Sequence, residues 1–245
     1  MLSHSKKNKL FNKLALYLNL AKDIKCPLVI ITASKKKFAS LYQFSCLNED
    51  IEPKMITEIC SNTCAFYDQN THTIVIKKSY YKDYRPETTL YHEMIHHIQY
   101  QYGNSAGKYS IFSEGLTEVI THLLTGNFED TAYKTEFILS LELLKRAYSN
   151  NFILIVNSIK KYHVHTNKNK FILELLKKSK IFKRPNKIEE CLTKTCDELK
   201  SSGAYQRAAF KECLKILNQY LKEPIKNLSF KKYKTYINYL RKLQN

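Results

Sequence analysis

The chain carries the stretch LYHEMIHHIQY at residues 90–100. Pro86 suits the first turn of a helix and Gly103 suits the position after its end, so a helix is predicted between them. On that helix His92 and His96 stand one turn apart on one face, while Glu93 lies roughly 100° around the axis from His92. Two imidazoles at this spacing can bind one Zn²⁺, and Glu93 is placed to act as a general base.

A second motif, SEGLTE, follows at residues 113–118. Glu114 lies 18 residues beyond His96, on a second predicted helix that begins at Ser110 or Ser113 and ends before Gly126. Gly115 removes a side chain where two helices must approach closely enough to share an ion. Glu118 falls one turn after Glu114 and could accept a hydrogen bond from the nitrogen of a zinc-bound histidine that does not bind the metal.

These residues predict an open zinc site with His92, His96 and Glu114 as ligands. Two histidines and one glutamate leave a fourth position for water, which is the arrangement of catalytic zinc sites. The metal lowers the pKa of that water, Glu93 takes its proton, and peptide-bond hydrolysis follows. A metzincin site is excluded because Gln99 and Tyr102 stand in its Gly and His positions, and a three-histidine site would need His where Tyr100 stands. His97 and His122 are interpreted as structural histidines.

Residues 60–147 resemble the gluzincin-type zinc metallopeptidases. His92, Glu93 and His96 match the HExxH motif of that group, Glu114 matches its acidic ligand before Gly, and Glu118 stands where its acid is commonly Asp. The stretch FYDQNTHTIVI at residues 66–76 is similar to the hairpin and cleft-edge strand of these enzymes. The resemblance implies a zincin-like α+β fold with a helical lower lobe, one zinc per chain, and a peptide or protein substrate bound in extended form beside the edge strand.

Such an enzyme also needs a His or Tyr that stabilises the oxyanion, and no local motif marks one here. The candidates are Tyr133, Tyr148, His163 and His165.

The rest of the chain predicts an α+β catalytic domain over 1–147 and a lysine-rich helical region over 148–245. The first domain combines a small mixed sheet with the two motif helices. Strands are predicted at 27–32 and 41–46 and as a hairpin at 64–67 and 73–77, and helices at 5–22, 53–61, 131–147, 151–161, 170–180, 187–200, 203–221 and 229–243.

The charge of the chain is strongly asymmetric. Residues 1–144 hold 16 basic and 15 acidic residues, whereas 145–245 hold 24 basic and 7 acidic residues. The alternative hypothesis is therefore a basic protein that binds nucleic acid or an acidic partner, with a structural or vestigial zinc site. The aromatic residues of 230–240 repeat at helical spacing, which favours a packing role for them.

The cysteine count and the N-terminus predict a cytoplasmic protein. Seven cysteines leave one unpaired in any disulfide scheme, which is typical of reduced thiols. Lysines followed by LALYL at 14–18 imitate a signal peptide, but Asn19 and Lys22 interrupt its apolar part. Because no apolar run approaches 18 residues, we expect no membrane partner.

Overall fold

The computed structural model describes residues 4–21, 23–46, 53–83, 86–103, 108–128, 131–201, 206–226 and 228–244. These described residues are mostly helical and contain one small mixed sheet of three strands, so the predicted α+β class is confirmed. Contacts divide the chain into two compact units, Met1–Gln101 and Tyr102–Asn245.

The sheet of the first unit contains β1 (Leu28–Thr32), β2 (Ala65–Asp68) and β3 (Thr73–Lys77) in the order β1-β3-β2. β1 runs parallel to β3, and β2 runs antiparallel to it. In the turn between β2 and β3, the Asp68 carboxylate accepts hydrogen bonds from the Asn70 backbone N–H at 2.9 Å and from the Thr71 hydroxyl at 2.5 Å. This side-chain cap closes the hairpin that the sequence predicts.

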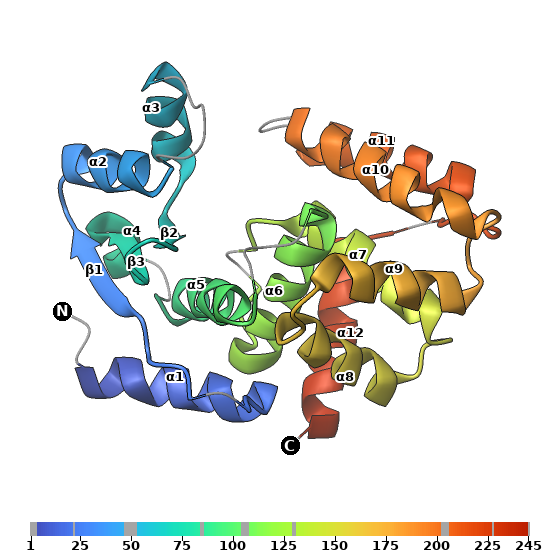
Figure 1. The fold of residues 1–245 in the computed structure, drawn as a ribbon, viewed down its shortest axis with the longest axis horizontal. Coiled ribbons are helices and arrows are strands. Elements are labelled where there is room, and N and C mark those ends of the chain that lie inside the picture. Colours follow the sequence, from blue (N-terminus) through green and yellow to red (C-terminus); the bar gives the residue numbers. More distant parts are fainter. Residues whose placement is uncertain are drawn as a thin grey trace. The chain divides into compact units, whose positions relative to one another are not determined.

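Helices lie on both faces of the sheet (Figure 1). α2 (Lys35–Ser45) and α3 (Pro53–Asn62) pack with Phe66 and Val75 in one apolar cluster. Because side chains alternate along a strand, Ile74 and Ile76 point to the other face. α5 (Pro86–Gln101) packs against β2 and β3, and α1 (His4–Leu18) packs against α5. A short helix, α4 (Lys78–Asp83), follows β3.

The strand predicted at 41–46 is wrong, because this segment is part of α2. The hydroxyl of Ser34 caps the helix by accepting a hydrogen bond from the Lys37 N–H at 3.1 Å. Phe38, which is buried, and the half-buried Leu41 and Tyr42 then fall at i, i+3 and i+4 and contact the sheet together. The apolar and aromatic run that suggested a strand is the packing face of a helix.

The described residues of the second unit form helices and one isolated bridge, between Phe182 and Leu221. Its helices are α6 (Ser110–Thr125), α7 (Lys134–Ala147), α8 (Phe152–His163), α9 (Lys168–Ser179), the short 3₁₀ helix η1 (Pro185–Lys187), α10 (Ile188–Ser201), α11 (Gln206–Tyr220) and α12 (Phe230–Gln244). α6 is the core helix, with α7, α8, α10 and α12 packed around it. Every residue from 111 to 124 is buried except Glu114. Gly126 ends α6 in the left-handed region at φ 69°.

α12 packs as its apolar spacing predicts. Tyr233, Ile237 and Leu240 are buried, and α12 contacts α6 and α7. The guanidinium of Arg241 donates to the carbonyl of Leu123 at 2.9 Å, near the end of α6. A cation at this position complements the negative end of the helix dipole.

The division by contacts falls after Gln101, whereas the sequence places a boundary between 147 and 148. In the structure α7 and α8, on either side of residue 147, belong to the same unit. All seven cysteines of the chain lie in described segments, and none of them forms a disulfide bond. Among the described helices, none combines the length and the apolar character needed to cross a bilayer.

Candidate metal site

His92 and His96 lie one turn apart on α5, as the sequence predicts. Their Nε2 atoms are 3.0 Å apart and the two rings meet at 73° with centroids 4.7 Å apart. His92 is 9% exposed and His96 is half-buried. Two nitrogen ligands held tetrahedrally at ~2.0–2.1 Å from zinc stand roughly 3.3 Å apart. The two nitrogens are therefore within a few tenths of an ångström of a metal-binding separation.

Gln99, one turn beyond His96, is a site residue that the sequence reasoning missed. It is fully buried, and its carbonyl Oε1 accepts a hydrogen bond of 3.1 Å from Nδ1 of His96. A neutral imidazole that donates through Nδ1 carries its lone pair on Nε2. Gln99 thus favours the tautomer in which Nε2 of His96, the atom that faces His92, carries the lone pair that a metal would bind. In the sequence, the signal that could have identified Gln99 is an amide residue three positions after a predicted ligand.

Glu114 stands in the second turn of α6. It is half-buried in a helix that is otherwise buried from 111 to 124. The fully buried Tyr162 of α8 is near it: burial raises the pKa of Tyr162 and the Glu114 charge raises it further. Burial, followed by the carboxylates of Glu114 and Glu118, also raises the pKa of Glu136 to about 7. Glu114, the predicted ligand, therefore lies with Glu118 and Glu136 in a cluster of carboxylates that has little contact with water.

A ring nitrogen of His92, a ring nitrogen of His96 and a carboxylate oxygen of Glu114 all lie within 4.8 Å of one another. No other set of three or more His, Cys, Asp and Glu side chains in the described part of the chain is arranged to hold a metal ion. These three residues could bind one metal ion. The structure thus groups the three residues that the sequence names as ligands.

Glu93 shares the burial of its neighbours on α5, with 8% of its surface exposed. It follows His92 directly in the sequence, so its side chain points roughly 100° around the helix axis from that of His92. A general base must lie within hydrogen-bond reach of the proton that it takes up, and a position beside a predicted ligand suits that requirement.

Gly115 permits a close approach of α6 to α7. A Cβ atom at this position would lie 2.3 Å from the Glu136 carbonyl oxygen and 2.4 Å from Oγ of Ser140. The expected role of Gly115 was an approach between the two motif helices, whereas the observed approach is to α7. The glycine thus fixes the helix that carries Glu114 against the core of its own unit.

Glu118 is held by the segment that leads into α7. Its Oε1 atom accepts hydrogen bonds from the backbone N–H groups of Ala132, at 3.3 Å, and Tyr133, at 3.5 Å. Its Oε2 atom lies 3.3 Å from Nε2 of His122, and only 3% of Glu118 is exposed. These contacts set the orientation of the carboxylate, and its predicted hydrogen bond to a ligand histidine stays a prediction.

His122 is a structural histidine, as expected. Its Nδ1 atom donates to the Asn127 carbonyl at 2.5 Å, and its Nε2 atom lies 3.0 Å from Oγ1 of Thr131. The ring stacks on Phe128 and meets Phe137 edge-on.

His97 is structural as well. Burial lowers the pKa of His97 to about 4, although its hydrogen bond to the Lys25 carbonyl works in the other direction. The neutral ring donates from Nε2 to the Lys25 carbonyl at 2.9 Å, so its Nδ1 atom accepts from the Tyr67 hydroxyl at 3.0 Å. His97 thus ties α5 to β2 and to the segment before β1.

The four candidate oxyanion stabilisers all lie in the second unit, in different surroundings. Tyr133, 37% exposed, precedes α7, and the half-buried Tyr148 follows it. His163 is fully buried, and its Nε2 atom donates to the Leu116 carbonyl of α6 at 3.2 Å. His165 is half-buried and accepts a hydrogen bond from the Asn167 N–H. Of these four residues, His163 is the one that forms a hydrogen bond to α6, the helix that carries Glu114.

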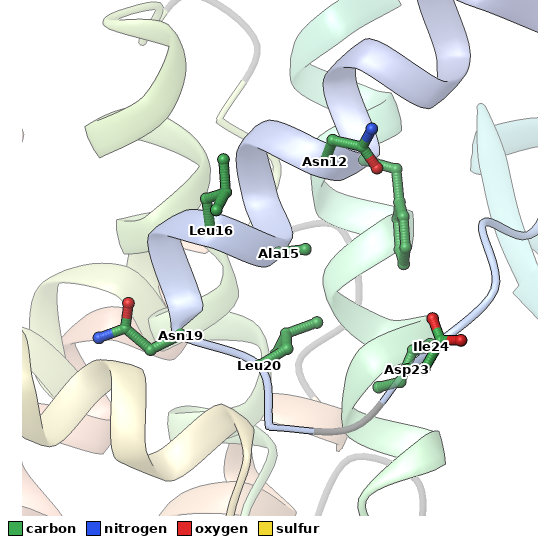
Figure 2. A pocket seen from close by; sticks show the side chains of 8 residues that line it. Asn12, Ala15, Leu16, Asn19, Leu20, Asp23 and Ile24 are labelled. Atoms are coloured by element: carbon green, nitrogen blue, oxygen red, sulfur yellow. The ribbon is translucent and has the colours of Figure 1, made fainter.

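An open cavity of about 450 Å³ lies beside α1 in the first unit (Figure 2). It is lined by Phe11, Asn12, Ala15, Leu16, Asn19, Leu20, Asp23 and Ile24. None of the candidate site residues lines this cavity, and Asp23 is its only titratable group. The cavity therefore contributes no side chain to the candidate metal site.

Comparison of the chain with protein-family models, curated proteins and solved structures gives no match.

Proposed function

We propose that this chain is a zinc-dependent metallopeptidase of the gluzincin type, with a zincin-like arrangement of its sheet and two motif helices. The observation that supports the proposal is the grouping of His92, His96 and Glu114, with their potential ligand atoms within 4.8 Å. Two imidazole nitrogens and one carboxylate oxygen are the donors that catalytic zinc sites use.

Zinc held by these three residues would supply a Lewis acid that polarises the scissile carbonyl and lowers the pKa of water. Glu93, beside His92 on α5, would accept a proton from the attacking water and pass it to the leaving amine. Gln99 holds His96 in the ligating tautomer. Glu118, fixed by two backbone N–H groups, would orient a ligand histidine.

The proposed substrate is a peptide in extended conformation. β2 is an edge strand of the sheet and packs against α5, the helix that carries both histidines. Backbone groups on the outer side of an edge strand can pair with an added peptide strand. This arrangement supports the binding mode that the gluzincin resemblance implies.

Two substitutions test the proposal. Glu93→Ala should retain one zinc per chain and lose peptide hydrolysis by ~10²–10⁴-fold, because a general base contributes about that much. Glu114→Ala should lose the metal as well as the activity. Zinc content by atomic spectroscopy and cleavage of an unstructured protein such as casein are the measurements.

Matched controls are Glu87→Ala on α5 and Glu189→Ala on α10, which remove exposed acids. Both should leave zinc content and turnover unchanged. Wild-type protein that takes up no zinc, or a Glu93→Ala variant with intact turnover, would contradict the proposal.

A further inference from the structure

An exposed cationic surface lies in the second unit, and the proposed peptidase does not use it. The segment 177–187, KKSKIFKRPNK, carries six cations and no acid, and the nearest acids in sequence are Glu174 and Glu189. All six cations are exposed. We define the basic corner as 177–187 together with the adjoining segment 219–226.

Backbone hydrogen bonds join the two segments of the basic corner. Phe182 and Leu221 form an antiparallel bridge. The Lys183 N–H donates to the Tyr220 carbonyl at 2.8 Å, and the Lys222 N–H donates to the Ile181 carbonyl at 2.9 Å. These hydrogen bonds fix the two segments side by side.

Side-chain clamps fix the second of these segments further. The amide of Asn218 bonds both the N–H and the carbonyl of Ile225, and Arg146 donates to the carbonyls of Glu223 and Pro224. A surface that is already ordered loses less conformational entropy when a partner binds.

The bridge also determines which side chains face outward. Phe182 and Leu221 are buried, with 1% and 0% exposed. Lys183 and Lys222, which directly follow the two bridge residues, are both exposed, and the ammonium of Lys183 donates to the Gln219 carbonyl at 3.2 Å. Two separate segments therefore bring exposed cations close together.

Most of these cations keep their charge uncompensated. Within the described part of the chain, Lys187 pairs with Glu190 at 2.7 Å. No ion pair with a described acid forms at the remaining cations, which are Lys177, Lys178, Lys180, Lys183, Arg184, Lys222 and Lys226. The corner contains eight cations and one acid, the exposed Glu223, so it creates a local positive potential.

We propose that the basic corner binds the phosphate backbone of nucleic acid. None of the large apolar side chains that are exposed in the described residues lies in the corner. A protein partner is held mainly by apolar or aromatic anchors, which the corner lacks. An anionic lipid surface attracts clustered cations electrostatically, so binding to anionic vesicles is the competing outcome. Closely spaced cations without such an anchor fit a partner whose recognition is electrostatic throughout, which is the phosphodiester backbone.

The salt dependence of binding measures this directly. Each cation that neutralises a duplex phosphate adds about −0.9 to the slope of log K against log salt concentration. The variant Lys180→Gln, Lys183→Gln, Arg184→Gln should therefore make that slope shallower by about 2.7 and weaken binding to a short labelled DNA duplex at low salt.

A variant with the same change in net charge provides the control. Lys231→Gln, Lys232→Gln, Lys242→Gln removes three cations from α12, each of them exposed. This control should alter the slope by less than one cation's share. Circular dichroism and thermal unfolding of both variants establish that the fold is retained.

Three outcomes would overturn the proposal. They are a wild-type protein with no affinity for the duplex at low salt, equal slopes for the two triple variants, and corner-dependent binding to phosphatidylserine vesicles or polyglutamate that is tighter than binding to the duplex. None of these measurements depends on zinc or on hydrolysis.

Discussion

At the scale of single residues, the site depends on polar side chains that orient one another. The buried amide of Gln99 accepts from Nδ1 of His96 and leaves Nε2 to face His92. A buried donor without its acceptor costs about 1–3 kcal/mol, and ligand histidines depend on such partners for their orientation.

Gln99→Leu should therefore lower zinc affinity by roughly 10–100-fold, the range for loss of such a partner. Gln99→Glu should preserve or raise the affinity, because a carboxylate accepts the same hydrogen bond and increases the basicity of the ring. Competition with a chromogenic chelator measures both. Gln101→Leu, on the same helix, is the control and should behave as wild type; a Gln99→Leu variant with unchanged affinity would show that Gln99 only fills space.

Lys168 carries a second effect of burial at this scale. It is 4% exposed, it begins α9, and burial lowers the pKa of Lys168 to about 8 from 10.5. Its ammonium donates to the His165 carbonyl at 3.2 Å. The charge of Lys168 is thus buried at the positive end of a helix dipole. The native state therefore binds the Lys168 proton less tightly than the unfolded chain does.

Between pH 8 and pH 10.5 the unfolded chain binds more protons at Lys168 than the native chain does, so the contribution of Lys168 to the free energy of unfolding rises with pH. Below pH 8 the contribution is constant and destabilising. Lys168→Met should accordingly be more stable than wild type at pH 7 by up to roughly 3 kcal/mol, with the difference shrinking toward pH 10.5. Urea unfolding at several pH values measures this, and a difference that is flat with pH would contradict it.

At the scale of elements, the packing of α6 on α7 determines the position of Glu114. Gly115→Ala would place a methyl group 2.3 Å from the Glu136 carbonyl oxygen, and that oxygen belongs to a helix backbone that cannot turn away. We expect a loss of about 1–3 kcal/mol in the free energy of unfolding, or more, from overpacking.

Urea unfolding of Gly115→Ala measures this loss, with Ser113→Ala, which removes an atom from the same buried helix, as the control expected within about 1 kcal/mol. Because the helices must separate, zinc affinity should fall together with stability. A variant as stable as wild type would show that α7 can shift at no cost.

At the scale of the whole molecule, composition and contacts divide the chain at different points. The excess of lysine begins near residue 145, whereas the contacts divide the chain after Gln101. The distribution of lysines reflects the composition of the surface, whereas the contacts reflect how the core is packed. α6 is covered by α8, α10 and α12 as well as by α7, so the segment with Glu114 belongs with the basic helices.

The sequence by itself determined the features that depend on neighbours along the chain. The i, i+4 spacing placed His92 and His96 on one helix face, the Asp68 turn closed the hairpin, and Gly126 ended α6. Backbone hydrogen-bond periodicity and local turn chemistry are enough to fix such features. The strand prediction at 41–46 was wrong because local pattern alone was not enough there. A short apolar run fits both the helical and the strand period, and only packing against the sheet selects the helix.

Only the tertiary structure decided which helix Gly115 meets, that Tyr162 lies near Glu114, and that segments 177–187 and 219–226 join in one cationic surface. These pairs are far apart in sequence, and nothing in their local pattern names the partner. Burial of apolar faces selects among many possible pairings of helices, and that selection is made by the chain as a whole.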